Sequence, residues 1–138
     1  MSPKKTGENG DKIPVSKSLL NGFFQLILER RLSEAERSLE EIETKIRAEG
    51  LNEFNRGFIR ALKGILLMHR SNDQYVFLSS LNPNNIDALR KYYQEFTRDA
   101  GNMLHGDYDR GYFLAMAKYI YFMLKHAESS RKMGYHLY

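Results

Sequence analysis

Apolar residues recur at intervals of three and four along most of this chain. The first such stretch follows Pro14 and Ser16 and holds six apolar positions: Leu19, Leu20, Phe23, Phe24, Ile27 and Leu28. This spacing places all six on one face of an α-helix, which is the pattern of a helix that packs against a core. The sequence therefore predicts an N-terminal helix with one buried face.

A helical hairpin is expected next, over about residues 32–70. Ser33 followed by Glu36 has the form of a capping box, which predicts that a helix begins at Ser33, and Gly50 is placed to end it. The two helices carry matching apolar rows, the first through Leu32, Ala35, Leu39, Ile42 and Ile46, the second through Phe54, Phe58, Ala61, Ile65 and Met68. Because only a short turn at 50–52 separates them, they should pack antiparallel.

A second hairpin is expected over about 86–127, after a connector at 71–85 that ends in turn-forming residues. The apolar residues of the connector are predicted to pack as a short helical turn or as an extension of the bundle. Its first helix presents Ile86, Leu89, Tyr93, Phe96, Ala100 and Met103, and its second presents Tyr108, Tyr112, Ala115, Tyr119 and Phe122. A turn at His105 and Gly106 joins them. The pattern predicts one helical domain over 16–128, a disordered tail over 1–15 and a flexible C-terminal tail over 129–138.

The two hairpins match each other at a constant offset of 54 residues. The closest correspondence sets the segment 53–58, Glu-Phe-Asn-Arg-Gly-Phe, against 107–112, Asp-Tyr-Asp-Arg-Gly-Tyr. The apolar rows keep the same register through both hairpins, which indicates an internal duplication. The predicted fold is therefore all-α, with tandem duplicated antiparallel hairpins, similar to a four-helix bundle, behind an N-terminal helix.

The repeat resembles tetratricopeptide-like helical hairpins. The residues that carry the resemblance are Gly106-Asp107-Tyr108 with Ala115, and Leu32-Ser33-Glu34-Ala35 with Leu39. The resemblance implies a role in protein–protein interaction and names no partner.

The composition narrows the chemistry that is available. The chain has 138 residues, 42% of them hydrophobic and 28% charged, and contains no cysteine. Disulfides, thiolate metal sites and cysteine nucleophiles are thereby excluded. No uncharged stretch approaches the ~20 residues that span a bilayer, and residues 1–13 lack the apolar core of a secretory signal. We expect a cytoplasmic protein without a cofactor or a metal.

A row of basic residues on the second helix allows two interpretations. Its members are Arg56, Arg60, Lys63 and Arg70, and no acidic residue lies between Phe54 and Asn72. With a net charge of +4, such a row could follow a nucleic-acid backbone. The preferred interpretation is a set of ion pairs with the preceding helix, which carries glutamates at matching spacing: Glu36, Glu40 and Glu43.

Arg56 and its counterpart Arg110 stand beside Gly57 and Gly111, near the start of the second helix of each hairpin. They could form twin anion sites, because a helix N-terminus attracts negative charge. The preferred alternative is structural: each arginine pairs with a carboxylate or with the last carbonyl groups of the preceding helix, and each glycine allows two helices to approach closely.

Arg98 and His105 have a spacing that resembles the ribonuclease motif of HEPN-type domains, where an arginine and a histidine act on an RNA phosphodiester. The preferred alternative makes His105 a helix-end residue and leaves Arg98 in solvent. The alternation of His105, Asp107 and Asp109 could suggest a metal, but Asp107 is better explained as a helix cap.

Three aromatic residues of the second hairpin lie off its apolar rows, namely Tyr92, Phe113 and Tyr121. They are the predicted interaction surface. The leading expectation is a non-enzymatic protein–protein interaction or assembly module, a homo-oligomer or a subunit of a larger assembly. A basic nucleic-acid-associated protein is the alternative, and a HEPN-like ribonuclease ranks third.

Overall fold

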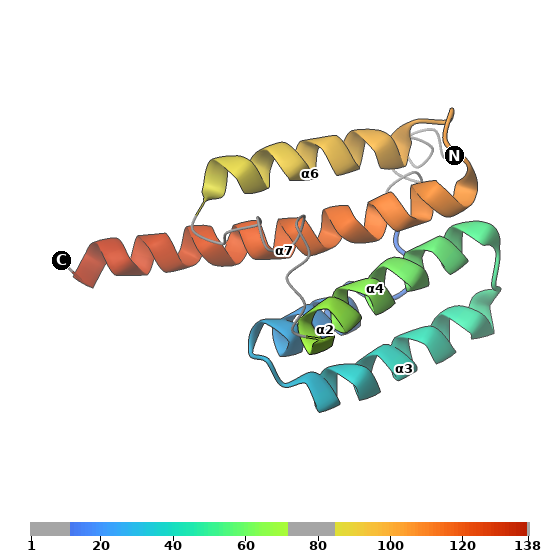
Figure 1. Ribbon diagram of the computed structural model, residues 1–138, viewed down its shortest axis with the longest axis horizontal. Helices are drawn as coiled ribbons and strands as arrows, with labels where there is room; N and C mark the ends of the chain where they lie inside the picture. Colours follow the sequence, from blue (N-terminus) through green and yellow to red (C-terminus); the bar gives the residue numbers. More distant parts are fainter. Residues whose placement is uncertain (1–11, 72–84, 138) are drawn as a thin grey trace, which may run out of the picture.

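The computed structural model describes residues 12–71 and 85–137, with side chains as far as residue 130, and Figure 1 shows its helices. The described part is all-α and holds five helices: α2 (Lys17–Leu28), α3 (Leu32–Glu49), α4 (Glu53–Ser71), α6 (Ile86–Gly101) and α7 (Asp107–Leu137). The prediction of an all-α fold is confirmed. Most of the tail expected over 1–15 lies outside the described residues. The connector, whose packing was also predicted, lies almost wholly outside them.

The N-terminal helix α2 forms as its apolar spacing predicts. The Ser16 hydroxyl accepts a hydrogen bond from the Leu19 amide at 3.1 Å and caps the helix. At the other end Arg30 has a φ of 60°, and the amides of Arg30 and Arg31 donate to the carbonyl groups of Ile27 and Leu26. This is a Schellman ending with a non-glycine residue in the left-handed position, and it turns the chain directly into α3.

The capping box predicted at Ser33 does not form. Helix α3 begins one residue earlier, at Leu32, and its cap residue Arg31 makes no side-chain cap hydrogen bond. The Arg31 guanidinium instead bonds the carboxylate of Glu34 at 2.6 and 2.8 Å, which lowers the pKa of Glu34. The carboxylate of Glu36 is also committed elsewhere, because it accepts from Arg70 of α4.

The turn between α3 and α4 is built from polar caps. Gly50 adopts a φ of +127°, a conformation that favours glycine. Asn52 accepts from the Asn55 amide at 2.8 Å, and the Asn55 side chain donates back to the Gly50 carbonyl oxygen at 2.7 Å. The hairpin expected over about 32–70 is thereby closed.

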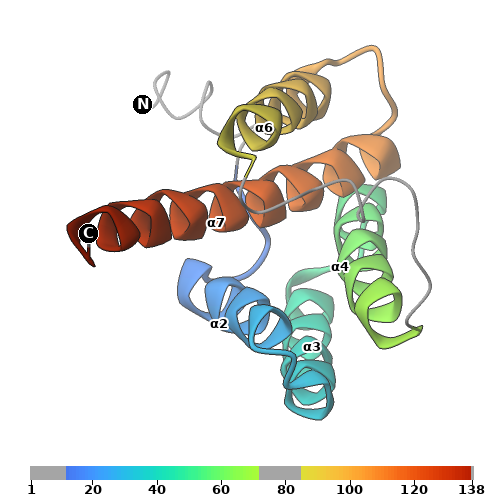
Figure 2. The same ribbon diagram turned by 60° about the vertical axis from the view of Figure 1, so that its left-hand side comes forward.

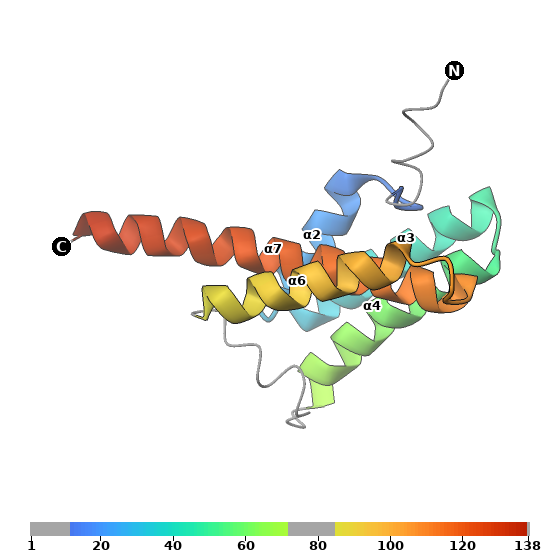
Figure 3. The ribbon, with the colours of Figure 1, turned by 90° about the horizontal axis from the view of Figure 1, so that it is seen from above.

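The second pair of helices begins at Ile86 as predicted and differs from its prediction at the C-terminal end of each helix. Helix α6 stops at Gly101, and Asn102 accepts from the Leu104 amide in the turn that follows. Met103, predicted to lie in the core, is therefore 76% exposed. Helix α7 continues to Leu137, where the sequence pattern predicted a flexible tail from residue 129, and its last turns extend beyond the other helices (Figures 1 and 3).

Helix α7 lies at the centre of the molecule. It packs extensively against α4 on one side and α6 on another, and less extensively against α2. Figures 1 and 2 show α6 on the side of α7 away from α3. The two hairpins therefore meet through their second helices, with their first helices outside.

The core follows the predicted apolar rows on α2 and α3 and departs from them on α4 and α7, where Leu62, Leu114 and Ile120 are buried outside the rows. Tyr108, predicted to lie in the row of α7, is 38% exposed. Phe24 of α2 stacks on Tyr119 and Phe122 of α7 at centroid distances of 5.4 and 5.7 Å. The largest fully buried side chains come from the described helices and their apolar faces: Leu20, Phe23, Phe24, Ile27, Ile42, Ile46, Phe58, Leu62, Ile65, Leu89, Leu114 and Ile120.

Candidate interaction surfaces

The outer face of the α3–α4 hairpin, which we call the α3–α4 face, carries an acidic row and a basic row. The acidic row comes from α3 (Glu36, Glu40 and Glu43) and the basic row from α4 (Arg60, Lys63 and Arg70). A shallow hollow of about 380 Å³ lies between the two rows. Its apolar lining is formed by Leu39, Leu66 and Leu67.

Two ion pairs connect the rows. Arg70 and Glu36 approach to 2.5 Å, and Lys63 and Glu43 to 3.4 Å. The hydrogen bonding that Arg70 donates to the Glu36 carboxylate lowers the pKa of Glu36 and raises the pKa of Arg70. These contacts match the preferred interpretation of the basic row, in which the charges pair between helices.

The remaining charges of this face differ in their surroundings. Glu40 and Arg60 are exposed and make no ion pair within the described part of the chain. Leu67 is 56% exposed in the same hollow, whereas Leu39 and Leu66 are buried. The face thus presents one exposed leucine and two unpaired charges of opposite sign.

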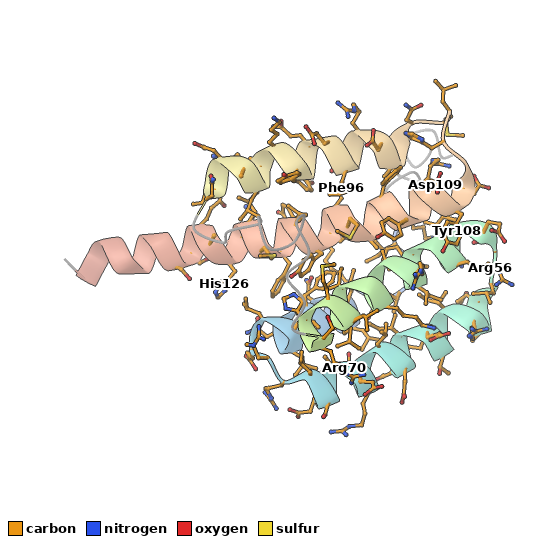
Figure 4. The ribbon with its side chains drawn as sticks, in the orientation of Figure 1. Arg56, Arg70, Phe96, Tyr108, Asp109 and His126 are labelled. Atoms are coloured by element: carbon orange, nitrogen blue, oxygen red, sulfur yellow. The ribbon has the colours of Figure 1, made fainter. Side chains whose placement is uncertain are left out.

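Arg56 lies apart from the rest of the predicted basic row. It sits in the first turn of α4, at the opposite end of that helix from Arg70 (Figure 4), and forms an ion pair with Glu53 at 3.4 Å. The structure therefore brings together three of the four predicted residues, Arg60, Lys63 and Arg70, and leaves Arg56 at the helix end.

Helices α4 and α7 cross at two glycines. A Cβ atom added to Gly57 would overlap the carbonyl oxygen of Tyr108, and one added to Gly111 would overlap the carbonyl oxygen of Phe54. Each helix thus presses its backbone against a glycine of the other. Figure 4 shows Arg56 and Tyr108 at this end of the molecule.

Arg110 lies beside this crossing and is used structurally. Its Nε donates to the Ala100 carbonyl oxygen at 2.9 Å, in the last turn of α6, where a cation is favourable. It also forms an ion pair with Asp107 at 3.5 Å and lies over the Phe54 ring. Because only 12% of its side chain is exposed, these contacts favour the structural interpretation over an anion site.

The three predicted surface aromatics lie along the contact between α6 and α7. Phe113 is half-buried, 6.2 Å from Phe96 and 5.2 Å from His105 between ring centroids. Tyr121 is 41% exposed, packs against Tyr93 with the ring centroids 5.3 Å apart, and lies under the Lys125 ammonium. Tyr92 is partly buried against the core. Of the three side chains, Tyr121 is the most exposed to solvent.

The residues of the HEPN-like pattern lie around the α6–α7 turn. The Arg98 side chain is 71% exposed and pairs with Asp99 at 3.4 Å, and His105 lies 3.8 Å from the same carboxylate. Leu104, next to His105, is 93% exposed. Asp107 is the first residue of α7 and pairs with Arg110. No group of three or more metal-ligating side chains was found where the structure is described.

A partly buried polar pair between α4 and α7 was not predicted. His69 of α4 and Tyr119 of α7 are joined by a hydrogen bond of 3.0 Å. Burial lowers the pKa of His69, with a further contribution from the charge of Arg30, and burial raises the pKa of Tyr119 to about 12. The partners are fifty residues apart, so no local spacing could indicate the pair.

A larger open hollow of about 840 Å³ lies elsewhere, lined by residues 12–16, the end of α3 and the start of α4. Its polar groups include Ser16, Asn52 and Asn55, which already serve the caps of α2 and α4.

The helices of the described residues include none long and apolar enough to cross a membrane.

Comparison with known proteins adds no relative. No protein-family model matches the chain, no curated protein matches it, and no solved structure resembles its fold closely enough to count as a match.

Proposed function

We propose that this protein is a helical protein–protein interaction or assembly module that acts by binding and not by catalysis. The observation that carries the proposal is Leu67, which is 56% exposed within a hollow whose other leucines are buried. Together with Leu39 and Leu66 it gives the hollow an apolar lining that charged residues surround, and an apolar centre with a polar rim is the usual composition of a protein–protein interface.

The tandem duplication belongs to the same proposal. Gly57 and Gly111 are separated by 54 residues, as are their respective contacts Tyr108 and Phe54, and the contacts are reciprocal. Two copies of one hairpin related by a local two-fold axis would produce this reciprocity. We infer that the ancestral unit was a single hairpin that paired with a second copy through its second helix.

The proposal is tested by the mass of the protein in solution. Sedimentation equilibrium, or size-exclusion chromatography with light scattering, over a wide range of concentration should show a species larger than the 16.2 kDa chain. A protein that stays monomeric at the highest concentration would contradict self-assembly. Replacing Leu67 by Ser should reduce the association, because it removes the exposed apolar group without adding a charge.

The alternative proposal is binding of a nucleic acid through the basic row of α4. It is supported by the net charge of +4 and by Arg60, which makes no ion pair with another described residue. Against it, Glu36 and Glu43 form ion pairs with Arg70 and Lys63, and their carboxylates would repel phosphates. Binding of RNA or DNA at low salt that falls steeply with salt, and that is lost in the Arg60→Glu, Lys63→Glu double variant, would favour this alternative.

A further inference from the structure

We infer that the occupant of the α3–α4 face is a second copy of this chain, docked about a two-fold axis that runs along the hollow, parallel to the two helices. This inference rests on the proposed function and names the partner of that same surface. The argument comes from the order of the charges on the face.

The acidic and basic rows lie side by side on antiparallel helices. A rotation of 180° about an axis along the hollow exchanges the two sides, so the acidic row of one copy faces the basic row of the other. A two-fold axis across the hollow would instead set each row against itself and repel. The charge order therefore selects one of the two face-to-face symmetries.

The ion pairs define the register of this arrangement. Glu36 lies level with Arg70, and Glu43 lies level with Lys63, because each pair is in direct contact. A rotation about an axis parallel to the helices keeps every residue at its own level. Each ion pair of one chain would thus lie opposite the same ion pair of the other chain, and the four side chains would form a ring of alternating charges. Such charge networks stabilise more than isolated exposed pairs.

The groups left unused within one chain fit the same arrangement. Glu40, which has no ion partner in the described chain, lies one helical turn from Glu36 and Glu43. In the pair it faces the basic row of the other copy, with Lys63 the nearest cation. Leu67 lines the hollow from α4, between Lys63 and Arg70 along that helix, and the second copy would remove it from water.

Single-cysteine variants test the geometry directly, since the natural chain has no cysteine. Leu67→Cys should be joined efficiently into dimers by a short thiol-specific crosslinker. Leu104→Cys is the matched control: Leu104 is 93% exposed, more than Leu67 at 56%, so random collision would favour the control. Equal or weaker crosslinking at residue 67 than at residue 104 would overturn the inference.

Charge reversal provides a second, independent test by sedimentation. Glu40→Lys alone and Lys63→Glu alone should each weaken self-association about tenfold, because each places like charges across the axis. An equimolar mixture of the two variants should associate more tightly than either one alone. Lys125→Glu, an equally large charge change on α7, should leave the association unchanged, and circular dichroism should show that all variants remain helical.

The outcomes separate this inference from the proposed function. A dimer that neither reversal weakens, and that Leu67→Cys does not trap, would overturn the docking geometry and leave self-assembly through another face. A strict monomer at all concentrations would overturn both. Charge reversals that abolish binding to RNA while the protein remains monomeric would assign the face to nucleic acid.

Discussion

The crossing of α4 and α7 depends on two hydrogen atoms, one on each glycine. Replacing Gly57 by alanine puts a methyl group where the Tyr108 carbonyl oxygen already lies, and replacing Gly111 does the same against Phe54. The obstructing atoms belong to backbone in the helix partner, so no side-chain rotation relieves the overlap. The helices would have to separate by about an ångström, which loosens the close packing around the crossing.

The size of the effect follows from two opposing terms. Overpacking a well-packed interface costs about 1–3 kcal/mol and sometimes more, while alanine in a helix gains about 0.5–1 kcal/mol over glycine. Each variant should therefore lose about 1–2 kcal/mol of unfolding free energy, with the loss at the upper end because backbone cannot yield as a side chain does. The two losses should be similar, because the contacts are reciprocal.

Gly64→Ala is the matched control. Gly64 lies in the same helix as Gly57, and a Cβ added there meets nothing within 4 Å. This variant should gain about 0.5–1 kcal/mol. Urea unfolding followed by circular dichroism measures all three changes. If Gly57→Ala proved as stable as Gly64→Ala, the close crossing described above would not exist in solution.

Three further predictions concern single side chains and are measured by the same unfolding assay. His69 is partly buried with a lowered pKa, so the unfolded chain takes up its proton first and the free energy of unfolding should fall as pH drops below about 6.5. His69→Gln should flatten that part of the pH profile, and an unchanged slope would assign the proton uptake to another group. Thr97 has a buried hydroxyl with no hydrogen-bond partner in the described structure. Thr97→Val should therefore leave the free energy of unfolding unchanged or raise it by up to about 1 kcal/mol. A clear loss of stability would show that the hydroxyl makes a hydrogen bond in solution. Arg110→Met should lower the free energy of unfolding by about 1–2 kcal/mol, because it removes the hydrogen bond to a helix-end carbonyl group. Arg56→Met removes an exposed ion pair and should change the free energy of unfolding by less than about 0.5 kcal/mol. Equal losses would show that the two arginines have the same structural role.

The sequence predicted the helices well because burial follows local spacing. Ala35, Leu39, Ile42 and Ile46 are all buried on α3, as the interval of three and four requires. The same logic overextended α6: Met103 continues the spacing, but the helix has already ended at Gly101. Periodicity reports which face of a helix is apolar and does not report where the backbone stops being helical.

Other features depended on contacts that no local pattern contains. The capping box at Ser33 does not form: α3 already begins at Leu32, so Ser33 lies inside the helix, and the carboxylate of Glu36 bonds Arg70 of α4, which is a tertiary contact. The end of α7 was missed because the residues after Glu128 show no apolar interval, although helical structure continues to Leu137. The bond between His69 and Tyr119 joins two helices that only the fold brings together.

The matched segments around the two glycines show which features the two helix pairs share and which differ between them. A glycine is needed at each crossing position because the constraint is a backbone contact, which is the same seen from either helix. The neighbouring arginine has no such constraint: Arg110 is almost buried and bonds to the end of α6, whereas Arg56 is half exposed and pairs with Glu53 in its own helix. Similar sequence around the two glycines therefore indicates a shared backbone geometry, and a common ligand for the two arginines does not follow from it.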